Sequence, residues 1–159
     1  MSKLRRYLEP GASYYVTSVT NRREKIFLSP KVCKLFIVTM EFYKYYLDYK
    51  LYAFVVMPDH FHAIIEPGNE FNISVIMNKI KGNFGNKYNK MVGRSGNVWQ
   101  SRFFDEGITD RKEFISKINY IHNNPVRAGL AQSPADYEFS SYNYYQNKTV
   151  NYLIDIPGI

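Results

Sequence analysis

Two of the three histidines in the chain, His60 and His62, are two residues apart in the run Val-Val-Met-Pro-Asp-His-Phe-His-Ala-Ile-Ile-Glu over 55–66. If this run is a β-strand, the two histidines point to one side and Phe61 points to the other. Two imidazoles on one side can share a metal ion. The apolar side can pack on the core and fix the register, because a slip of one residue would bury both histidines. The alternative is a pair of ordinary half-exposed histidines, and only the rest of the chain can discriminate between the two.

Basic residues are concentrated in the middle of the chain. The formal net charge is +7, and no acidic residue lies between Glu70 and Asp105. Six basic residues in this interval contribute +6: Lys79, Lys81, Lys87, Lys90, Arg94 and Arg102. A surface of this kind attracts a polyanion, most commonly nucleic acid. The alternative is a solvated lysine-rich helix, but the missing carboxylates favour nucleic acid. The 15 Tyr, 11 Phe and one Trp can stack on bases or pack in a core.

Length and cysteine content limit the class of protein. The chain has 159 residues, which predicts one domain over 1–159, with a core over about 13–145 and a tail over about 146–159. Cys33 is the one cysteine, so an internal disulfide and the multi-cysteine zinc sites are excluded. We find neither a signal peptide nor an apolar run long enough to span a membrane, and therefore expect a cytoplasmic protein with no membrane partner.

Hydrophobic periodicity predicts an α+β fold. Ser29 and Pro30 are typical of a helix start, and Asp110 with Glu113 has the spacing of a capping box. Gly82 and Gly85 weaken the second half of the middle helix. The predicted elements are, in order, a strand over 14–20, a helix over 30–49, a hairpin of strands over 51–56 and 60–66, a helix from 72, a strand over 98–104 and a helix from 110. The simplest arrangement is an antiparallel sheet with helices packed on one face.

The last predicted helix carries a polar face. Tyr120 lies about 200° around the helix from the apolar residue Ile118, and Asn124 lies only about 40° from Tyr120. Lys117 is beside both, so the three polar residues share a face that the core does not need. Pro125 should stop or kink the helix.

These residues resemble a known family. His-Phe-His at 60–62 after Met-Pro-Asp resembles the HUH motif (histidine, large apolar residue, histidine) of the single-tyrosine transposases that move single-stranded DNA. Val-Trp-Gln-Ser-Arg-Phe-Phe-Asp at 98–105 and Tyr-Ile-His-Asn-Asn-Pro-Val-Arg-Ala-Gly-Leu at 120–130 are most similar to the branch of REP-associated tyrosine transposases. The similarity runs from about 14 to 142, and three motifs in this order are specific.

The resemblance implies a ferredoxin-like antiparallel sheet and a divalent metal ion, Mg²⁺ or Mn²⁺. Carried over by position, His60 and His62 would be metal ligands, Tyr120 the nucleophile and Asn124 the third ligand, where many relatives have Gln. The implied activity is a transposase and endonuclease that cleaves and rejoins hairpin-containing single-stranded DNA through a covalent 5′-phosphotyrosine. A phosphotyrosine conserves the bond energy, so no ATP is needed. Relatives are monomers or homodimers, and the REP-associated branch is expected to be monomeric.

We expect ten side chains to contact DNA: Arg22, Arg23, Lys79, Lys81, Lys87, Arg94, Trp99, Arg102, Lys117 and Arg127. Some of them have alternative roles. Trp99 could instead complete the core, which is the preferred interpretation, and surface salt bridges are the alternative for Arg102 and Arg127. His122 lies about 200° from Tyr120 on the helix, so we expect it to face elsewhere.

Two rival functions differ in class. A zinc hydrolase needs a third His or carboxylate, but Glu66 lies far along the same strand face from His62, and nucleotide hydrolases with three alternating histidines need one where this chain has Ile64. The more serious rival is a non-catalytic protein that binds a nucleic-acid hairpin and descends from a transposase. The presence of His60, His62 and Tyr120 together argues against that loss of activity.

Overall fold

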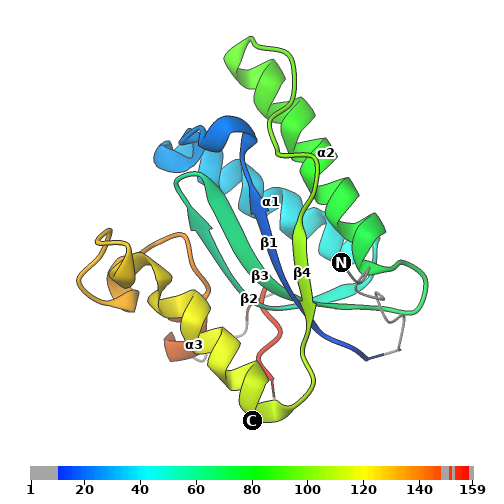
Figure 1. Cartoon of the computed structure of the whole chain (residues 1–159), viewed down its shortest axis with the longest axis vertical. Helices are drawn as coiled ribbons and strands as arrows, with labels where there is room; N and C mark the ends of the chain where they lie inside the picture. The colour runs from blue at the N-terminus through cyan, green and yellow to red at the C-terminus, as the bar shows by residue number, and fades with distance from the viewer. Residues whose placement is uncertain (1–10, 148–150, 152, 158–159) are drawn as a thin grey trace.

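The computed structural model describes residues 11–147, 151 and 153–157, and it contains one four-stranded antiparallel sheet (Figure 1). The strands are β1 (Tyr14–Val19), β2 (Tyr49–Met57), β3 (His60–Pro67) and β4 (Phe104–Gly107), in the spatial order β2-β3-β1-β4. Helix α1 (Pro30–Tyr46) connects β1 to β2, and α2 (Ile73–Val92) connects β3 to β4. This is the split βαβ arrangement of ferredoxin-like folds, so the predicted α+β class and sheet are confirmed.

The histidine strand β3 lies inside the sheet, with a partner on each side. The hairpin to β2 has a two-residue turn, because Met57 pairs with His60 across it. On the other side Val19 pairs with His60 and Thr17 pairs with His62. Since both neighbours are antiparallel and tightly registered, the two histidines are fixed along the strand as well as across it.

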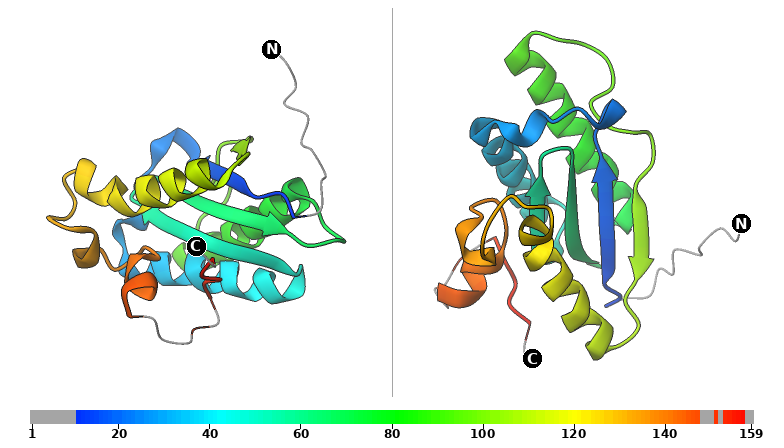
Figure 2. Two further views of the ribbon diagram at one scale, coloured as in Figure 1. Left: turned by 90° about the horizontal axis from the view of Figure 1, so that it is seen from below. Right: turned by 60° about the vertical axis from the view of Figure 1, so that its left-hand side comes forward.

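The helices do not all pack on one face, and that part of the prediction is wrong. Helices α1 and α2 cover one face, whereas α3 (Arg111–Arg127) crosses the other, as the two views in Figure 2 show. The reason lies in strands β2 and β3, whose central residues are buried on both sides. Phe61 packs toward α1 and α2, while Ile64 packs with Ile118 and Ile121 of α3. A strand that is apolar on both faces requires a cover on both faces.

Several element boundaries differ from the sequence-based prediction. Helix α1 ends at Tyr46 rather than at 49, and α2 passes through both of its interior glycines. The strand expected over 98–104 begins only at Phe104. The chain before it instead follows the end of β1, where Gln100 N donates to Val19 O at 2.9 Å and Asn21 N donates to Val98 O at 2.8 Å. The short elements are 3-10 turns at Asn21–Arg23, Ile26–Leu28 and Pro134–Asp136, and a helix α4 at Tyr142–Asn147. None of the described helices has the length and apolar character needed to cross a membrane.

Helix α3 begins as predicted but ends later than predicted. The Asp110 carboxylate accepts a hydrogen bond from Glu113 N at 2.8 Å, which is the expected cap. The helix does not stop at Pro125 but continues to Arg127. Proline removes only its own N–H donor, and Pro125 is in the last turn, where its carbonyl accepts from Leu130 N at 2.8 Å. The extra turn keeps Arg127 on the helix beside Tyr120.

The exposed edge of β2 is covered by the C-terminal part of the chain. Ser141 N donates to Phe54 O at 2.9 Å, and Val56 N donates to Phe139 O at 2.8 Å. Further along, Asp155 N donates to Leu51 O at 2.9 Å. Since open strand edges promote pairing with other chains, these bonds close one side of the sheet.

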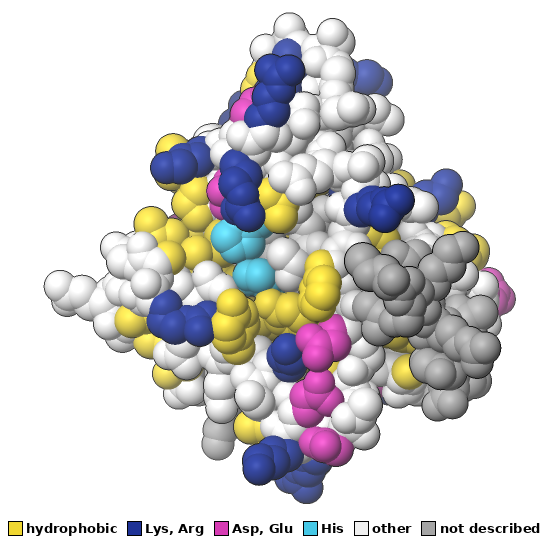
Figure 3. All heavy atoms as spheres, in the orientation of Figure 1, with side chains coloured by type: hydrophobic (Ala, Val, Ile, Leu, Met, Phe, Trp, Pro, Cys, Tyr) yellow, Lys and Arg dark blue, Asp and Glu magenta, His cyan; other side chains and the backbone are white. Residues whose placement is uncertain are grey.

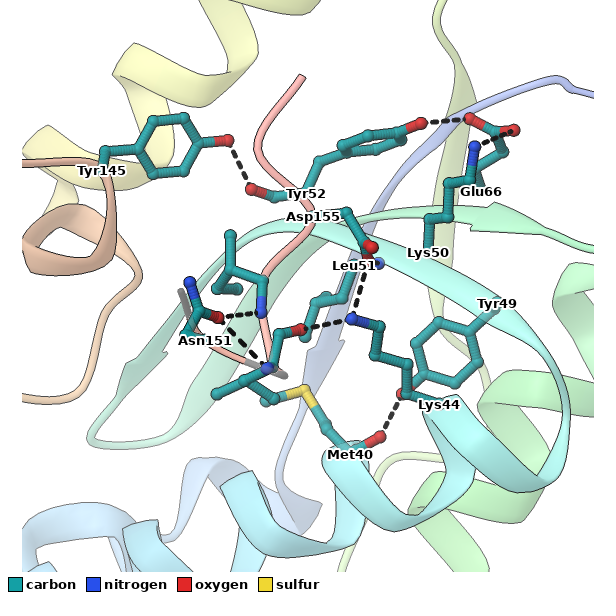
Figure 4. A network of polar contacts seen from close by, with 12 residues as sticks. Met40, Lys44, Tyr49, Lys50, Leu51, Tyr52, Glu66, Tyr145, Asn151 and Asp155 are labelled. Carbon is teal, nitrogen blue, oxygen red and sulfur yellow. Dashed lines mark hydrogen bonds and ion pairs between the residues drawn. The ribbon is translucent and has the colours of Figure 1, made fainter. Parts of the chain in front are cut away.

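Asp155 connects this cover to both the sheet and a helix (Figure 4). Its Oδ2 accepts from Leu51 N at 2.9 Å and is 2.8 Å from Lys44 Nζ on α1. Lys44 also donates to Leu153 O at 3.1 Å. The described part of the predicted tail is therefore attached to the domain at β2 and α1.

Replacing Asp155 with Ala should destabilise the fold. The change leaves Leu51 N and Lys44 Nζ without this carboxylate, and a hydrogen bond to a charged group contributes about 1.5–3 kcal/mol. We expect urea unfolding to show a loss of about that size with an unchanged slope. Glu70→Ala, which removes an exposed loop carboxylate, is the control, and equal stability of the two variants would contradict this role for Asp155.

Cys33 should behave as a reporter of unfolding. Its side chain is 0% exposed, and burial raises the pKa of the thiol to about 12. Only the thiolate reacts quickly with a disulfide reagent such as DTNB. We expect no labelling of the native protein at pH 8 and complete labelling in concentrated urea, with Cys33→Ser as the blank. Fast labelling under native conditions would show that the packing of α1 on the sheet opens readily.

Candidate active site

The polar residues selected from the sequence meet in one cavity. It lies between the end of the histidine strand and α3 and has a volume of about 470 Å³. Nine residues line it: Thr17, Val19, Arg23, His60, His62, Tyr120, Asn124, Arg127 and Ala128. Figure 3 shows histidine side chains open to this face with Lys and Arg side chains close by. The predicted nucleophile and all three predicted ligands are therefore neighbours in space.

His60 is oriented by the residue before it. Its Nδ1 is 2.6 Å from Asp59 Oδ1, and Arg23 Nη1 donates to the other carboxylate oxygen at 3.3 Å. Burial acts to raise the pKa of Asp59, but the hydrogen bonds and charges of His60 and Arg23 outweigh it and lower that pKa. An ionised carboxylate at Nδ1 holds the ring with Nε2 as the nitrogen available to a ligand.

His62 is held more deeply, by two hydroxyl groups of β1. Its Nδ1 is 2.8 Å from Tyr15 Oη and 2.7 Å from Thr17 Oγ1. Burial, together with the nearby His60 and Arg127, lowers the pKa of His62 to about 3. The ring is therefore neutral, which is the form that binds a cation. The His60 and His62 ring centres are 4.8 Å apart.

Helix α3 supplies the nucleophile candidate above this pair. Tyr120 is 42% exposed, and its ring lies edge-on to His62 with 5.9 Å between the ring centres. The guanidinium carbon of Arg127 is 3.9 Å from the centre of the Tyr120 ring. Asn124, one turn after Tyr120, is buried and lines the same cavity. The helix face that carries Tyr120 and Asn124 is therefore directed toward the end of the sheet where His60 and His62 lie.

The donor set fits a divalent ion that takes nitrogen and oxygen ligands. Because both histidines use Nδ1 for protein contacts, the two Nε2 atoms are the nitrogens left for a metal. No group of three His, Cys, Asp or Glu side chains that could hold a metal occurs among the described residues. A third protein ligand must then be of another type, and the Asn124 amide oxygen is in the cavity. Such a set suits Mn²⁺ or Mg²⁺ and leaves open positions for phosphate oxygens.

Eight of the nine predicted DNA-contacting cations are either exposed or partly buried. Six are exposed: Arg22, Arg23, Lys79, Lys87, Arg102 and Arg127. Of these, Arg23 also pairs with Asp59 at 3.3 Å. The other two are partly buried and form ion pairs. Arg94 Nη1 is 2.7 Å from Glu24 Oε2, and Lys117 Nζ is 3.1 Å from Glu106 Oε2 and 4.7 Å from the centre of the Tyr15 ring. Lys117 therefore connects α3 to β4 through Glu106 and to β1 through Tyr15.

Trp99 and Lys81 are largely buried, and their predicted contact with DNA stays a prediction. Both are 8% exposed, and Trp99 Nε1 donates to Lys81 O at 3.1 Å. Lys81 Nζ donates to Gln100 O at 3.1 Å, and burial lowers the pKa of this amine to about 8. Lys81 lies next to the buried stripe of α2, and the segment that follows the helix packs over its side chain. The sequence shows the charge of Lys81 but not that this later segment buries it.

Five residues that line the cavity or orient its histidines were missed by the sequence analysis: Tyr15, Thr17, Val19, Asp59 and Ala128. Asp59 directly precedes His60, so its position was a usable signal. Tyr15 and Thr17 are two residues apart on β1, as the histidines are on β3, but only the pairing of the two strands shows that they meet. His122 faces elsewhere, as expected, with Nε2 2.7 Å from Ser141 Oγ.

A family model described as "Transposase IS200 like" matches residues 10–124 of the chain. This match includes both histidines, Tyr120 and Asn124. The chain belongs to the IS200-like transposase family. The predicted relation to single-tyrosine transposases is thereby confirmed.

Two relatives of this transposase chain carry the more specific name. A REP-associated tyrosine transposase of Escherichia coli K12 is 27% identical over 146 residues, covering 90% of this chain and 84% of the relative. A Haemophilus influenzae protein assigned the same name is 26% identical over 153 residues, covering 90% and 86%. The predicted similarity to the REP-associated branch is therefore confirmed.

Solved structures agree with this family. The structure of a REP-associated tyrosine transposase bound to a REP hairpin matches with a TM-score of 0.75 and 26% identity, covering 100% of this chain and 95% of that one. A transposase structure from Deinococcus radiodurans R1 matches with a TM-score of 0.54 and 19% identity, covering 77% and 97%, which supports the fold alone.

Removing the hydroxyl groups that orient His62 should weaken metal binding. Tyr15→Phe combined with Thr17→Val keeps the shape but leaves Nδ1 without partners, and the loss of such outer contacts typically lowers metal affinity about 10–100-fold. Titration calorimetry with Mn²⁺ measures this. Thr39→Val is the matched control, because that buried hydroxyl donates to Leu35 O, inside α1. Equal Mn²⁺ affinity in both variants would show that the hydroxyl groups do not orient the ligand.

Proposed function

We propose that this chain is a metal-dependent single-stranded DNA transposase and endonuclease that cleaves and rejoins hairpin-containing DNA through a covalent 5′-phosphotyrosine. One observation carries the proposal: an exposed tyrosine, two oriented histidines and an asparagine line a single cavity in a member of the IS200-like family. The structural relative bound to a REP hairpin supports hairpin DNA as the substrate class.

The tyrosine is the attacking group in the proposed reaction. Its phenol oxygen forms a bond to the scissile phosphorus, the bond from phosphorus to the 3′ oxygen breaks, and the DNA is left with a free 3′-hydroxyl. The phenol proton passes to solvent, and the departing 3′ oxygen takes up a proton. Attack of a 3′-hydroxyl on the phosphotyrosine reverses these changes and rejoins the strand, so no other energy source is required.

Two arginines act on the tyrosine and the phosphate. The guanidinium of Arg127, 3.9 Å above the Tyr120 ring, fixes the ring in place. Arg23 lines the same cavity and is held at its mouth by Asp59. Both are exposed cations, which suits the binding of a DNA phosphate.

Three ligands would hold the metal ion: His60, His62 and Asn124. When bound there, a divalent ion would supply Lewis-acid polarisation of the scissile phosphate and would orient the leaving group. The hydrogen bonds at His60 and His62 Nδ1 fix the rings before DNA binds, so little reorganisation is needed.

The site is complete within one chain. The Tyr120 and His62 rings are 5.9 Å apart in the same molecule, and α3 is packed on the sheet through Ile118 and Ile121. A tyrosine in this position would act together with the histidines of the same chain. We therefore propose that the protein acts as a monomer on each cleavage site.

The decisive experiment is a gel assay for a covalent protein–DNA adduct. The protein is incubated with labelled single-stranded hairpin oligonucleotides and Mn²⁺. We expect an adduct with the wild type and none, a loss of at least about 10³-fold, with Tyr120→Phe. His62→Ala should also abolish the adduct. Tyr46→Phe, which changes a tyrosine that is 68% exposed on α1, is the matched control and should react normally.

The alternative function has its own outcome in the same experiment. If the wild type retards several hairpins on a native gel and forms no adduct with any of them, the chain is a non-catalytic hairpin-binding protein. An adduct that persists in Tyr120→Phe would instead assign the nucleophile to another residue.

A further inference from the structure

A second groove lies on the far side of the β1 end from the candidate active site. It runs between α2 and the chain segment that follows it, which Figure 1 shows returning alongside the helix, and its volume is about 400 Å³. From α2, one helical stripe contributes Asn78, Gly82, Asn86 and Asn89, and the returning segment contributes Asn97 and Gln100. None of these residues is used by the reaction proposed above.

The lining has an unusual chemistry for a protein groove. Five of the six residues just named carry a primary amide, the sixth, Gly82, has no side chain, and no carboxylate lines the groove. Its single cation, Lys81, is already committed to the Gln100 and Arg102 carbonyls at 3.1 and 3.5 Å. Primary amides offer a donor and an acceptor side by side, which is the pattern that pairs with the edges of bases.

Gly82 has no reason from packing to be glycine. It lies inside α2, and a Cβ atom added there would meet nothing within 4 Å. Gly85 differs, because its Cβ would lie 3.6 Å from the Val98 side chain. Glycine weakens a helix relative to alanine, so an interior glycine that faces open space points to a ligand that approaches the helix backbone.

Asn89 provides a second, independent sign. Its amide nitrogen donates to Gly96 O at 2.9 Å and so ties the returning segment to the helix. The other end of the same amide, Oδ1, is buried without a hydrogen-bond partner in the described chain. Buried acceptors are normally satisfied, and an amino group of a bound base would satisfy this one.

Position and charge identify the ligand as a polyanion that also reaches the active site. Lys79 and Lys90 are exposed and lie about 100° further around α2 than Asn78 and Asn89. Gln100 N bonds to Val19 O, and Val19 lines the active-site cavity. The groove and the cavity are therefore linked by a direct backbone hydrogen bond between their lining residues, and this adjacency is what would let one DNA strand reach both.

We propose that this groove binds the bases of a single-stranded DNA segment next to the cleaved phosphate, with Asn78, Asn86 and Asn89 reading base edges and Lys79 and Lys90 contacting the backbone. The inference extends the proposed function, because the strand bound here is the one that the active site would cut. Asparagine pairs best with adenine, so adenine-containing segments should bind most tightly.

The test measures binding without metal and without cleavage. Fluorescence anisotropy in EDTA compares labelled dA8 with an abasic octanucleotide, which has the same phosphates and no bases. We expect the wild type to prefer dA8 by about tenfold or more. Gly82→Leu, which fills the groove with a good helix former, and the double change Asn78→Ala with Asn86→Ala should remove that preference and leave abasic binding unchanged.

Controls separate a folding defect from a lost site. Gly82→Ala should raise the melting temperature by about 2 °C, and the circular dichroism of Gly82→Leu should match the wild type. Asn69→Ala, an exposed amide at the other end of β3 from His60, should keep the full preference for dA8. Folded groove variants that still prefer dA8, or a wild type that binds both probes equally, would overturn the assignment.

This outcome is independent of the covalent reaction. Loss of the base preference in the groove variants, together with no adduct in the gel assay, would retain the groove and reject the proposed reaction. An adduct in the gel assay, together with groove variants that still prefer dA8, would retain the proposed reaction and reject the groove.

Discussion

The pairing of β3 with a strand on each side is the constraint on which the rest of the structure depends. Val19 and Met57 both pair with His60, so the histidine strand cannot shift along either neighbour without disturbing the other. Phe61 adds a side-chain constraint, because it is fully buried between the sheet and α1 and α2. A shift of one residue would expose this ring and bury the imidazoles. The orientation of both histidines is thus a consequence of core packing.

The same register also builds the surroundings of the histidines. Thr17 is opposite His62, which brings its hydroxyl within hydrogen-bond distance of Nδ1, and Tyr15 reaches the same nitrogen from two residues away. At His60 the partner is Asp59, in the turn of the hairpin. The two candidate ligands therefore have different supports, a carboxylate at the mouth of the cavity and neutral hydroxyls deeper inside. This difference follows from where each histidine lies relative to the turn.

Helix α3 is the element that turns this end of the sheet into a site. Its apolar residues Ile118 and Ile121 pack on the second face of the sheet, against Ile64 and neighbours of β2. That packing presents the opposite edge of the helix, with Tyr120, to the histidines. The cap at Asp110 fixes the start of the helix, and its continuation past Pro125 adds Arg127 to the stack on the tyrosine. A fold with helices on only one face would leave the histidines without Tyr120, the candidate nucleophile.

A basic residue of this protein attracts DNA most strongly if its side chain is exposed and not already paired. The acid-free interval between Glu70 and Asp105 suggested a continuous basic surface, yet its members have three different fates. Lys79 and Lys87 are exposed, Arg94 is paired with Glu24 from a distant part of the chain, and Lys81 is an interior residue that bonds two carbonyls. The net charge is set by the sequence, whereas the field that a DNA strand meets is set by these contacts.

Local patterns in the sequence determined much of the fold and part of the site. The alternation around His60 and His62, the short turn between two apolar runs and the capping residue Asp110 each depend on neighbours within a few residues, and the structure has all three. The spacing of Tyr120 and Asn124 on one helical face is local in the same sense. Tertiary structure alone decided which side of the sheet α3 covers, that Trp99 and Lys81 are interior, and that Tyr15 and Thr17 contact His62. These outcomes depend on pairing between segments tens of residues apart, for which no local pattern carries a signal.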